Sequence, residues 1–439
     1  MQPVDELISA RWIIPIEPSV TALESHSLAI DAGRIVALLP RAEAEFRYQP
    51  RHHVTLDQHV LMPGLVNLHT HAAMSLMRGL ADDLPLLEWL TKHIWPAEGR
   101  HVNPDFVYDG TLLAAAEMLR GGITCCNDMY FFPEQAAQAF VEAHMRATLG
   151  MIVIDFPTAY ANDAEDYLHK GIAMRDVHKH ATLLSFCLAP HAPYTVSDAT
   201  FERVVTLADE LDLSIHVHVH ETAGEIQDSQ AKHGVRPLQR LHRLGALGPN
   251  LIAVHSVHLT ADEIAQYAAL GISMAHCPSS NLKLASGFAP TAALAKAGVN
   301  IGLGTDGAAS NNRLDLFSEM RHAALVAKAH SGNAAALDAP SVLRMATLGG
   351  ARALGLDQQI GSLLPGKAAD LVAIDLSSPE LSPCYHPVSH LVYAAGREHV
   401  SDVWVAGRRV VRDRTLTTLD TARLQAKASL WQSRLAENA

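Results

Sequence analysis

The sequence is poor in the features that mark secreted, membrane-bound or nucleic-acid-binding proteins. Its 439 residues include five cysteines, an odd number with no Cys-x-x-Cys spacing, so we expect reduced thiols and no disulfide framework. The N-terminus lacks the basic segment of a signal peptide, and no apolar run reaches the roughly 18–20 residues of a membrane span. A net charge of −12 argues against nucleic acid or an anionic membrane as partner. The sequence therefore predicts a cytoplasmic protein that binds neither.

Apolar residues are abundant, at 49% of the chain, which is enough for a large core and more than one ordinary domain needs. Residues 1–58 and 357–439 are rich in short strands and turns, and we expect them to pack into one composite β-sandwich with a C-terminal helix. Residues 59–356 alternate strands with helices. The strands expected in the terminal parts are Leu7–Ile16, Ser27–Ile30, Arg34–Leu39, Leu371–Asp375, His390–Tyr393, Val400–Ala406 and Arg408–Arg412.

The central part contains eight short apolar runs separated by helical stretches, a pattern typical of parallel β/α units. The runs are Gly64–His69, Ile123–Asp128, Ala147–Ile154, Thr182–Ala189, Ser214–Val219, Leu251–Ser256, Ile272–His276 and Val299–Gly304. Eight such units predict an α/β fold of the (β/α)8 TIM-barrel class, whose functional groups lie at the carboxyl ends of the strands.

Polar residues end several of these strands, although a buried strand should read as unbroken aliphatic residues. His69 and His71 are two apart at the end of the first strand, so their side chains share a face. His218 on the fifth strand and Asp306 after the eighth complete a set of three nitrogens and one oxygen, which fits a metal with an open position for water. Packing alone explains such a set poorly, because each unpaired polar group costs a few kcal/mol.

Two further residues lie where they can act on water at this centre. Glu221 follows His218 by three residues and can shuttle protons, while His255 at the end of the sixth strand can steady developing charge. A binuclear site would want a bridging group, commonly a modified lysine, at the end of strand four. The run Leu183–Ala189 has no lysine, which favours one metal.

With these residues in place, the sequence resembles the amidohydrolase superfamily, and within it the methylthioadenosine/S-adenosylhomocysteine deaminases and the related triazine chlorohydrolases. The resemblance covers essentially the whole chain. The similar stretches are Pro63–His71, His71–Leu84, Glu88–Leu90, Ile94–Glu98, Ala189–Tyr194, Ser279–Leu284, Thr305–Asn312 and Gly361–Val372.

The resemblance implies zinc, or alternatively iron, held by His69, His71, His218 and Asp306, with Glu221 and His255 around the reactive water. It also implies substrate contacts. Glu98 and His191 would hold the ribose hydroxyls, Trp89 would wall the pocket, and Arg146 would meet the substrate tail. Some members have a second arginine soon after strand three, and here none occurs before Arg175. A carboxylate tail would lose a bidentate partner, so a short apolar 5′ group is at least as well supported.

The expected reaction is hydrolytic deamination of the adenine ring of a nucleoside: 5′-methylthioadenosine, S-adenosylhomocysteine, 5′-deoxyadenosine or adenosine. Asp306 and His255 position and deprotonate water activated by the metal, and Glu221 protonates the ring nitrogen beside C6. The alternatives are a triazine chlorohydrolase, a guanine or 8-oxoguanine deaminase and a catalytically inactive barrel scaffold. Oligomeric state is not readable from sequence, and a homo-oligomer is suggested by fold analogy alone.

Overall fold

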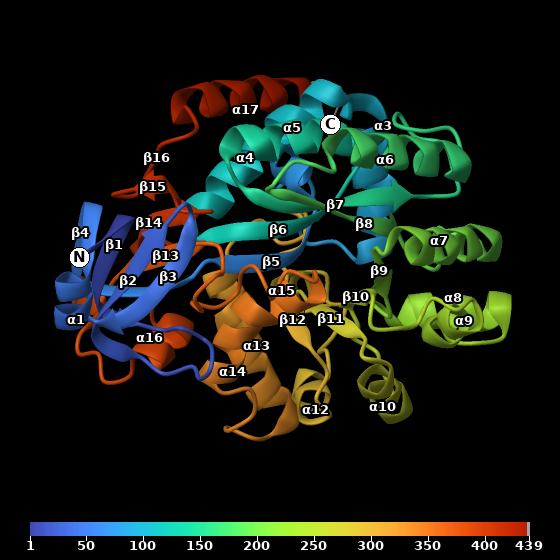
Figure 1. The fold of residues 1–439 in the computed structure, drawn as a ribbon. Helices are drawn as coiled ribbons and strands as arrows, with labels where there is room; N and C mark the ends of the chain where they lie inside the picture. Colours follow the sequence, from blue (N-terminus) through green and yellow to red (C-terminus); the bar gives the residue numbers. More distant parts are fainter. Residues whose placement is uncertain (437–439) are drawn as a thin grey trace.

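The computed structural model describes residues 1–436 and contains two eight-stranded sheets (Figure 1). One sheet is parallel, in the strand order β12-β11-β10-β9-β8-β7-β6-β5. The other is mixed and is built from both ends of the chain, in the order β16-β15-β14-β13-β4-β1-β2-β3. This arrangement confirms the predicted TIM-barrel class with a smaller β domain assembled from the two termini.

The eight parallel strands lie where the sequence predicts them, with ends that differ by two residues at most, as for Thr182 against Leu184. They are β5 (Leu65–Thr70), β6 (Ile123–Met129), β7 (Arg146–Val153), β8 (Leu184–Pro190), β9 (Ser214–Val219), β10 (Leu251–His255), β11 (Ser273–His276) and β12 (Ile301–Leu303). The first and last strands are joined beyond the ladder. The Asp306 amide donates to the His69 carbonyl (3.0 Å), and the Thr305 amide donates to the Asn67 side chain (2.9 Å).

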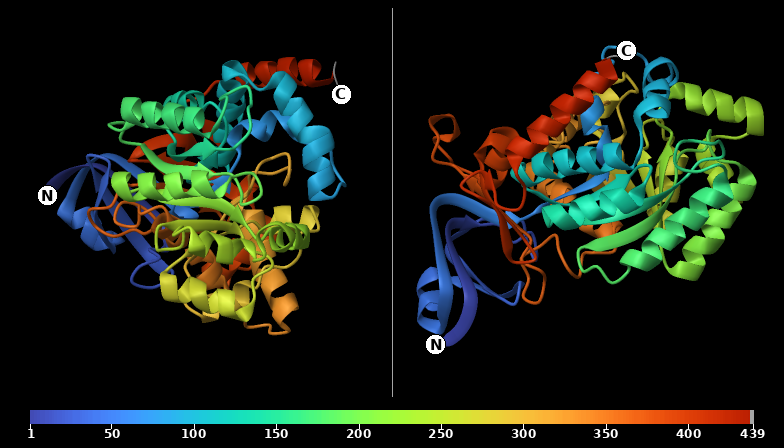
Figure 2. Two further views of the ribbon diagram at one scale, coloured as in Figure 1. Left: turned by 90° about the vertical axis from the view of Figure 1, so that its right-hand side faces the viewer. Right: turned by 90° about the horizontal axis from the view of Figure 1, so that it is seen from above.

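Helices cover the outside of the barrel (Figures 1 and 2). Several start at a residue whose side chain accepts from a first-turn amide, as Asn103, Asp163, Ser197, Thr222 and Thr260 do. The helices are α4 (Pro104–Arg120), α5 (Pro133–Ala143), α6 (Ala164–His178), α7 (Asp198–Leu211), α8 (Ala223–His233), α9 (Pro237–Arg243), α10 (Ala261–Leu270), α11 (Pro278–Lys283), α12 (Thr291–Lys296), α13 (Leu316–Ser331), α14 (Ala339–Arg344) and α15 (Gly350–Ala353). No helix within residues 1–436 is both long and apolar enough to span a bilayer.

The mixed sheet joins the termini through an antiparallel pair, in which Leu371 of β13 faces Pro63 of β4. Because β4 continues to Pro63, the sheet extends beyond the boundary predicted at residue 58. Its strands are β1 (Gln2–Ile13), β2 (Leu23–Asp31), β3 (Arg34–Pro40), β4 (Tyr48–Pro63), β13 (Leu371–Asp375), β14 (Val400–Val405), β15 (Arg408–Arg412) and β16 (Thr415–Leu416), and the short helix α1 (Arg41–Arg47) links β3 to β4.

The strand predicted at His390–Tyr393 is wrong, because this segment is the end of helix α16 (Pro387–Tyr393). Pro387 takes the first helical position, where its fixed φ favours a helix and its missing N–H costs nothing. The last helix, α17 (Thr421–Ala436), lies along α4 on the barrel's outer layer (Figure 2), where the Trp431 indole donates to Asp109 (2.9 Å).

Candidate metal centre and its cavity

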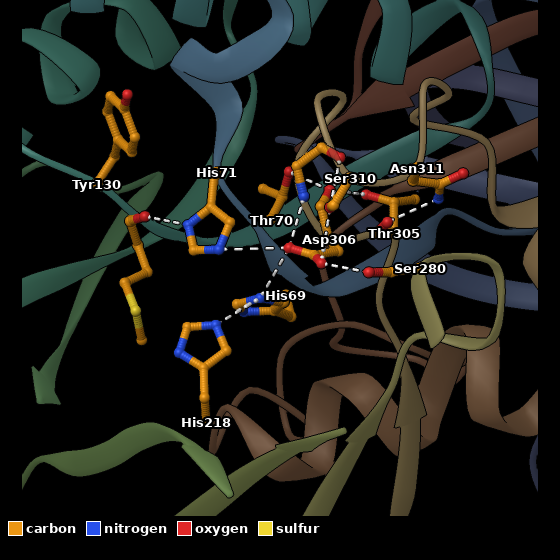
Figure 3. Close-up of polar contacts among 12 residues, drawn as sticks. His69, Thr70, His71, Tyr130, His218, Ser280, Thr305, Asp306, Ser310 and Asn311 are labelled. Atoms are coloured by element: carbon orange, nitrogen blue, oxygen red, sulfur yellow. Dashed lines mark hydrogen bonds and ion pairs between the residues drawn. The ribbon is translucent and has the colours of Figure 1, made fainter. Parts of the chain in front are cut away.

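Four of the sequence-predicted side chains meet at the mouth of the barrel (Figure 3). His69 lies on β5 and His71 directly after it, His218 lies on β9, and Asp306 follows β12. The Nε2 atoms of His69 and His71 are each 3.3 Å from Asp306 Oδ1, and the Nε2 atoms of His69 and His218 are 3.2 Å apart. In a tetrahedral zinc site with bonds of about 2.0–2.1 Å, neighbouring ligand atoms are about 3.3 Å apart. The spacing therefore fits one metal ion.

In His71 and His218, the hydrogen bond made by the outer nitrogen, Nδ1, leaves the inner nitrogen, Nε2, free to bind a metal. Nδ1 of His71 lies 2.6 Å from the Met129 carbonyl, and Nδ1 of His218 lies 2.6 Å from the His191 carbonyl. A carbonyl only accepts hydrogen bonds, so each Nδ1 carries the proton and each Nε2 turns a lone pair inward.

The third ring is oriented by another histidine. Nδ1 of His69 pairs with His216 Nε2 (3.0 Å), and burial lowers the pKa of His69 to about 4, so this imidazole is neutral at pH 7. The lone pairs of His71 and His218, the His69 ring and the Asp306 carboxylate thus meet at one point, an arrangement that a cation between them stabilises. This donor set matches what a divalent metal requires.

Asp306 is held by a close set of donors. Its Oδ2 accepts from Ser280 (2.6 Å) and Ser310 (2.8 Å), and its Oδ1 accepts from the Gly307 amide (2.7 Å). Burial alone would raise the pKa of Asp306, but the contact with His69 and the surrounding imidazoles hold that pKa well below its usual value. The carboxylate is therefore charged and fixed in orientation.

Glu221 and His255 lie beside this centre, Glu221 on the turn after β9 and His255 at the carboxyl end of β10. Glu221 Oε1 is 3.9 Å from His255 Nε2, and His255 Nδ1 pairs with the Asn281 side-chain oxygen (2.8 Å). The Glu221 amide donates to Glu225 (2.8 Å), which anchors the turn. Burial raises the pKa of Glu221, which favours a carboxyl group able to deliver a proton.

The mouth opens into a cavity of about 300 Å³ that also contains the predicted substrate contacts Glu98, His191 and Trp89. One wall is the segment between β5 and α4. It consists of the 3-10 turn η1 (Ala72–Met77), helix α2 (Leu86–Glu88), the π-helical η2 (Trp89–Ile94) and helix α3 (Trp95–His101). Burial raises the pKa of Glu98 to about 7 and lowers that of His191 to about 3. Most other lining residues are apolar.

The expectation that Arg146 meets the substrate tail is wrong. Arg146 is the first residue of β7, whereas the cavity is lined from the other end of that strand, by Ile152 and Ile154. Ile152 is six positions along the strand from Arg146, a rise of roughly 20 Å. The Arg146 guanidinium forms a buried bidentate pair with Asp370 (2.9 and 3.1 Å), which joins the barrel to the mixed sheet.

Several residues that organise the site were given no role by the sequence reasoning. Tyr130 donates to Glu98, Glu225 anchors Glu221, and Asn281 orients His255. Only Glu225 had a local signal, because Thr222-Ala223-Gly224-Glu225 has the Thr-x-x-Glu spacing of a helix capping box. Tyr130 and Asn281 act across 32 and 26 positions in the chain, and no short-range pattern reports such contacts.

Comparison with known proteins agrees with this geometry. Residues 60–410 match the model of the amidohydrolase family. A protein of Teredinibacter turnerae named 5-methylthioadenosine/S-adenosylhomocysteine deaminase is 48% identical to this chain, over 98% of each. A similarly named protein of Saccharophagus degradans is also 48% identical, over 99% of this chain and 97% of its own length.

A solved structure extends the likeness to the whole fold. The crystal structure of an adenosine deaminase from Xanthomonas campestris with bound zinc superposes with a TM-score of 0.98. Its sequence is 52% identical, and the match covers 99% of each chain.

Proposed function

The chain belongs to the amidohydrolase family, and on that premise we propose that it is a hydrolytic deaminase of 5′-substituted adenosines. The observation that carries the proposal is the convergence of His69, His71, His218 and Asp306 beside Glu221, at the base of a cavity that also holds Glu98 and His191. The names of the full-length relatives support the same reaction.

We assign the metal site to His69, His71, His218 and Asp306, with zinc as the proposed ion and iron as the alternative. A divalent metal held there supplies Lewis acidity, which makes water a nucleophile at neutral pH. Zinc suits three imidazoles and a carboxylate, and a zinc-bound structure exists for a relative that is 52% identical.

The reaction then depends on proton transfers by the surrounding side chains. Asp306 and His255 position the attacking water and accept a proton from it, with Asp306 fixed by Ser280 and Ser310. Glu221 gives its proton to the ring nitrogen next to C6 as the new C6–O bond forms. The proton taken from water passes to the exocyclic nitrogen, and the C6–N bond breaks with loss of ammonia. The C6 hydroxyl returns a proton to Glu221 as the adenine becomes hypoxanthine.

The cavity wall favours an uncharged 5′ group. Among the described residues that line the cavity, none is lysine or arginine, while Leu86, Leu90, Ile94, Trp95 and Phe156 are apolar. A carboxylate tail buried there would lose its hydration without gaining a cationic partner, which is costly. We therefore propose that 5′-methylthioadenosine is preferred to S-adenosylhomocysteine.

The test is a panel of adenosines that differ only at the 5′ position, incubated with zinc-loaded protein while the loss of adenine absorbance is followed. We expect kcat/KM for methylthioadenosine to exceed that for S-adenosylhomocysteine by roughly 10- to 100-fold, the value of one charged hydrogen-bonding partner. Intact zinc with no loss of adenine absorbance would refute the reaction. Equal kcat/KM values for the two nucleosides would refute the preference.

A further inference from the structure

Tyr130 is the barrel residue that forms a hydrogen bond with Glu98. It directly follows β6, its residue is 5% exposed, and its ring lines the cavity. Its hydroxyl donates to Glu98 Oε1 at 2.7 Å, across 32 positions of the chain. This bond joins the end of β6 to helix α3 inside the cavity.

Glu98 has little else to fix it. Within residues 1–436, Tyr130 is the one hydrogen-bond partner found for the Glu98 side chain, and Glu98 belongs to the seven-residue helix α3. The neighbouring Gly99 also lines the cavity, and a Cβ added there would meet no atom within 4 Å. The bond to Tyr130 is therefore the polar contact that orients the Glu98 carboxylate.

The residue before Tyr130 belongs to the metal centre. The Met129 carbonyl accepts from Nδ1 of His71, and the rings of His71 and Tyr130 have centroids 6.4 Å apart (Figure 3). Two consecutive residues at the end of β6 thus contact a metal-site histidine and a cavity carboxylate. The end of β6 therefore links the metal centre to Glu98 through two adjacent residues.

We propose that Tyr130 is a positioning residue for nucleoside binding: its hydroxyl holds one oxygen of Glu98 so that the other accepts from the ribose hydroxyls. The inference rests on the proposed function, in which Glu98 contacts the ribose. Tyr130 itself need not touch the substrate. Its contribution should therefore vanish for a substrate that lacks the 2′- and 3′-hydroxyls of the ribose.

The experiment compares adenosine with 2′,3′-dideoxyadenosine in zinc-loaded Tyr130→Phe, which removes the hydroxyl and keeps the ring. We expect KM for adenosine to rise roughly tenfold, the value of one buried hydrogen bond. We expect kcat and zinc content to stay within about twofold, and KM for the dideoxy nucleoside to be unchanged. Tyr160→Phe is the matched control, because the Tyr160 hydroxyl is buried without a hydrogen-bond partner in the described chain and does not line the cavity.

The pH dependence adds a readout that a purely structural role would not move. The Tyr130 bond lowers the pKa of Glu98 against the larger effect of burial. Loss of that bond should raise the pKa further and protonate Glu98 at higher pH. The increase in KM for adenosine should therefore be larger at pH 6 than at pH 8. An increase that is equal at both pH values, or equal for both nucleosides, would overturn the inference.

Glu98→Ala separates failure of the inference from failure of the proposed function. If this variant leaves KM for adenosine unchanged, Glu98 does not bind the ribose and the proposed contact is wrong. If Glu98→Ala raises KM and Tyr130→Phe does not, only the inference fails. Adding Tyr130→Phe to Glu98→Ala should raise KM no further, because the two residues act as one unit.

Discussion

The barrel buries polar side chains at both of its ends. The two groups differ in whether their donors, acceptors and charges are matched within the group. At the carboxyl end lies the mouth cluster, which consists of His69, His71, His218 and Asp306. At the amino end lies the Arg146–Asp370 ion pair, in which two hydrogen bonds join the guanidinium to the carboxylate. The charges of the Arg146–Asp370 ion pair cancel. Asp370 Oδ1 also accepts from the Ala406 amide (2.7 Å), so the pair needs no further partner. The mouth cluster gathers three imidazoles and a carboxylate at one point, and His71 and His218 turn acceptor nitrogens toward it.

Both groups are largely buried, so burial alone does not distinguish a structural cluster from a binding site. The matching of charges and hydrogen bonds does. A buried charge pair with matched donors needs nothing more, and removing one partner leaves an uncompensated charge. A buried set with only acceptors is incomplete until a cation joins it. The same contrast agrees with the barrel rule that groups at the carboxyl ends of strands serve chemistry and those at the other end serve stability.

The largest expected effect comes from breaking the mouth cluster with His218→Ala. We expect deaminase activity to fall by more than about 10³-fold, because the ion that activates water is lost or misplaced. Zinc should raise the melting temperature of the wild type by several degrees, as ligands of the native state do, and should raise that of the variant far less. Zinc analysis after dialysis and melting curves with and without zinc measure both effects.

His242→Ala is the matched control, because His242 is exposed on α9 and lies outside the mouth. This variant should keep wild-type zinc content and rates. A His218→Ala protein with one firmly bound zinc and near-normal turnover would show that the mouth cluster is not the metal site.

The sequence predicted the mouth better than its surroundings, for physical reasons. Strand positions follow from apolar runs, and the period of two places His69 and His71 on one face. Once eight strands are assigned, the barrel topology brings their carboxyl ends together without further information. The wall between β5 and α4 has no such rule, because its 3-10 and π-helical turns follow tertiary contacts and no simple hydrophobic period.

Arg146 shows where the reasoning from resemblance failed. Arg146 lies at the start of β7, and only the carboxyl end of this strand reaches the cavity. Its partner, Asp370, lies in another domain 224 positions away, which no local pattern reveals. The error at His390–Tyr393 has a different cause, because Pro387 is a local signal of a helix start and the short apolar run obscures it.

An intermediate effect should come from Glu225→Gln, which loosens the support of the mouth without touching the metal site. Glu225 accepts from two backbone amides, those of His220 (3.1 Å) and Glu221 (2.8 Å), one on each oxygen. A glutamine has one oxygen, so its NH2 group would face an amide N–H. Displacing Glu221 should lower kcat by roughly 10- to 100-fold with little change in KM. Steady-state kinetics on zinc-loaded protein measure this.

Thr260→Ala provides the comparison, because the exposed Thr260 is the N-cap of α10 and forms a capping box with Glu263. Loss of this box should lower the free energy of unfolding by about 1 kcal/mol and leave kcat unchanged. Equal losses of kcat in the two variants would mean that Glu225 acts through stability alone.

The smallest effect on activity should follow from Arg146→Leu, which breaks the Arg146–Asp370 ion pair. Asp370 would be left buried without its cation, so we expect the free energy of unfolding to fall by about 3–5 kcal/mol, measured by urea denaturation of the zinc-loaded protein. Because Arg146 lies at the far end of β7 from the cavity, KM should be unchanged for methylthioadenosine and for S-adenosylhomocysteine alike. A double variant that also carries Asp370→Leu should regain much of the lost stability, because it removes both charges together. A selective rise in KM for S-adenosylhomocysteine, with stability intact, would instead place Arg146 at the substrate and erase the distinction between the two ends of the barrel.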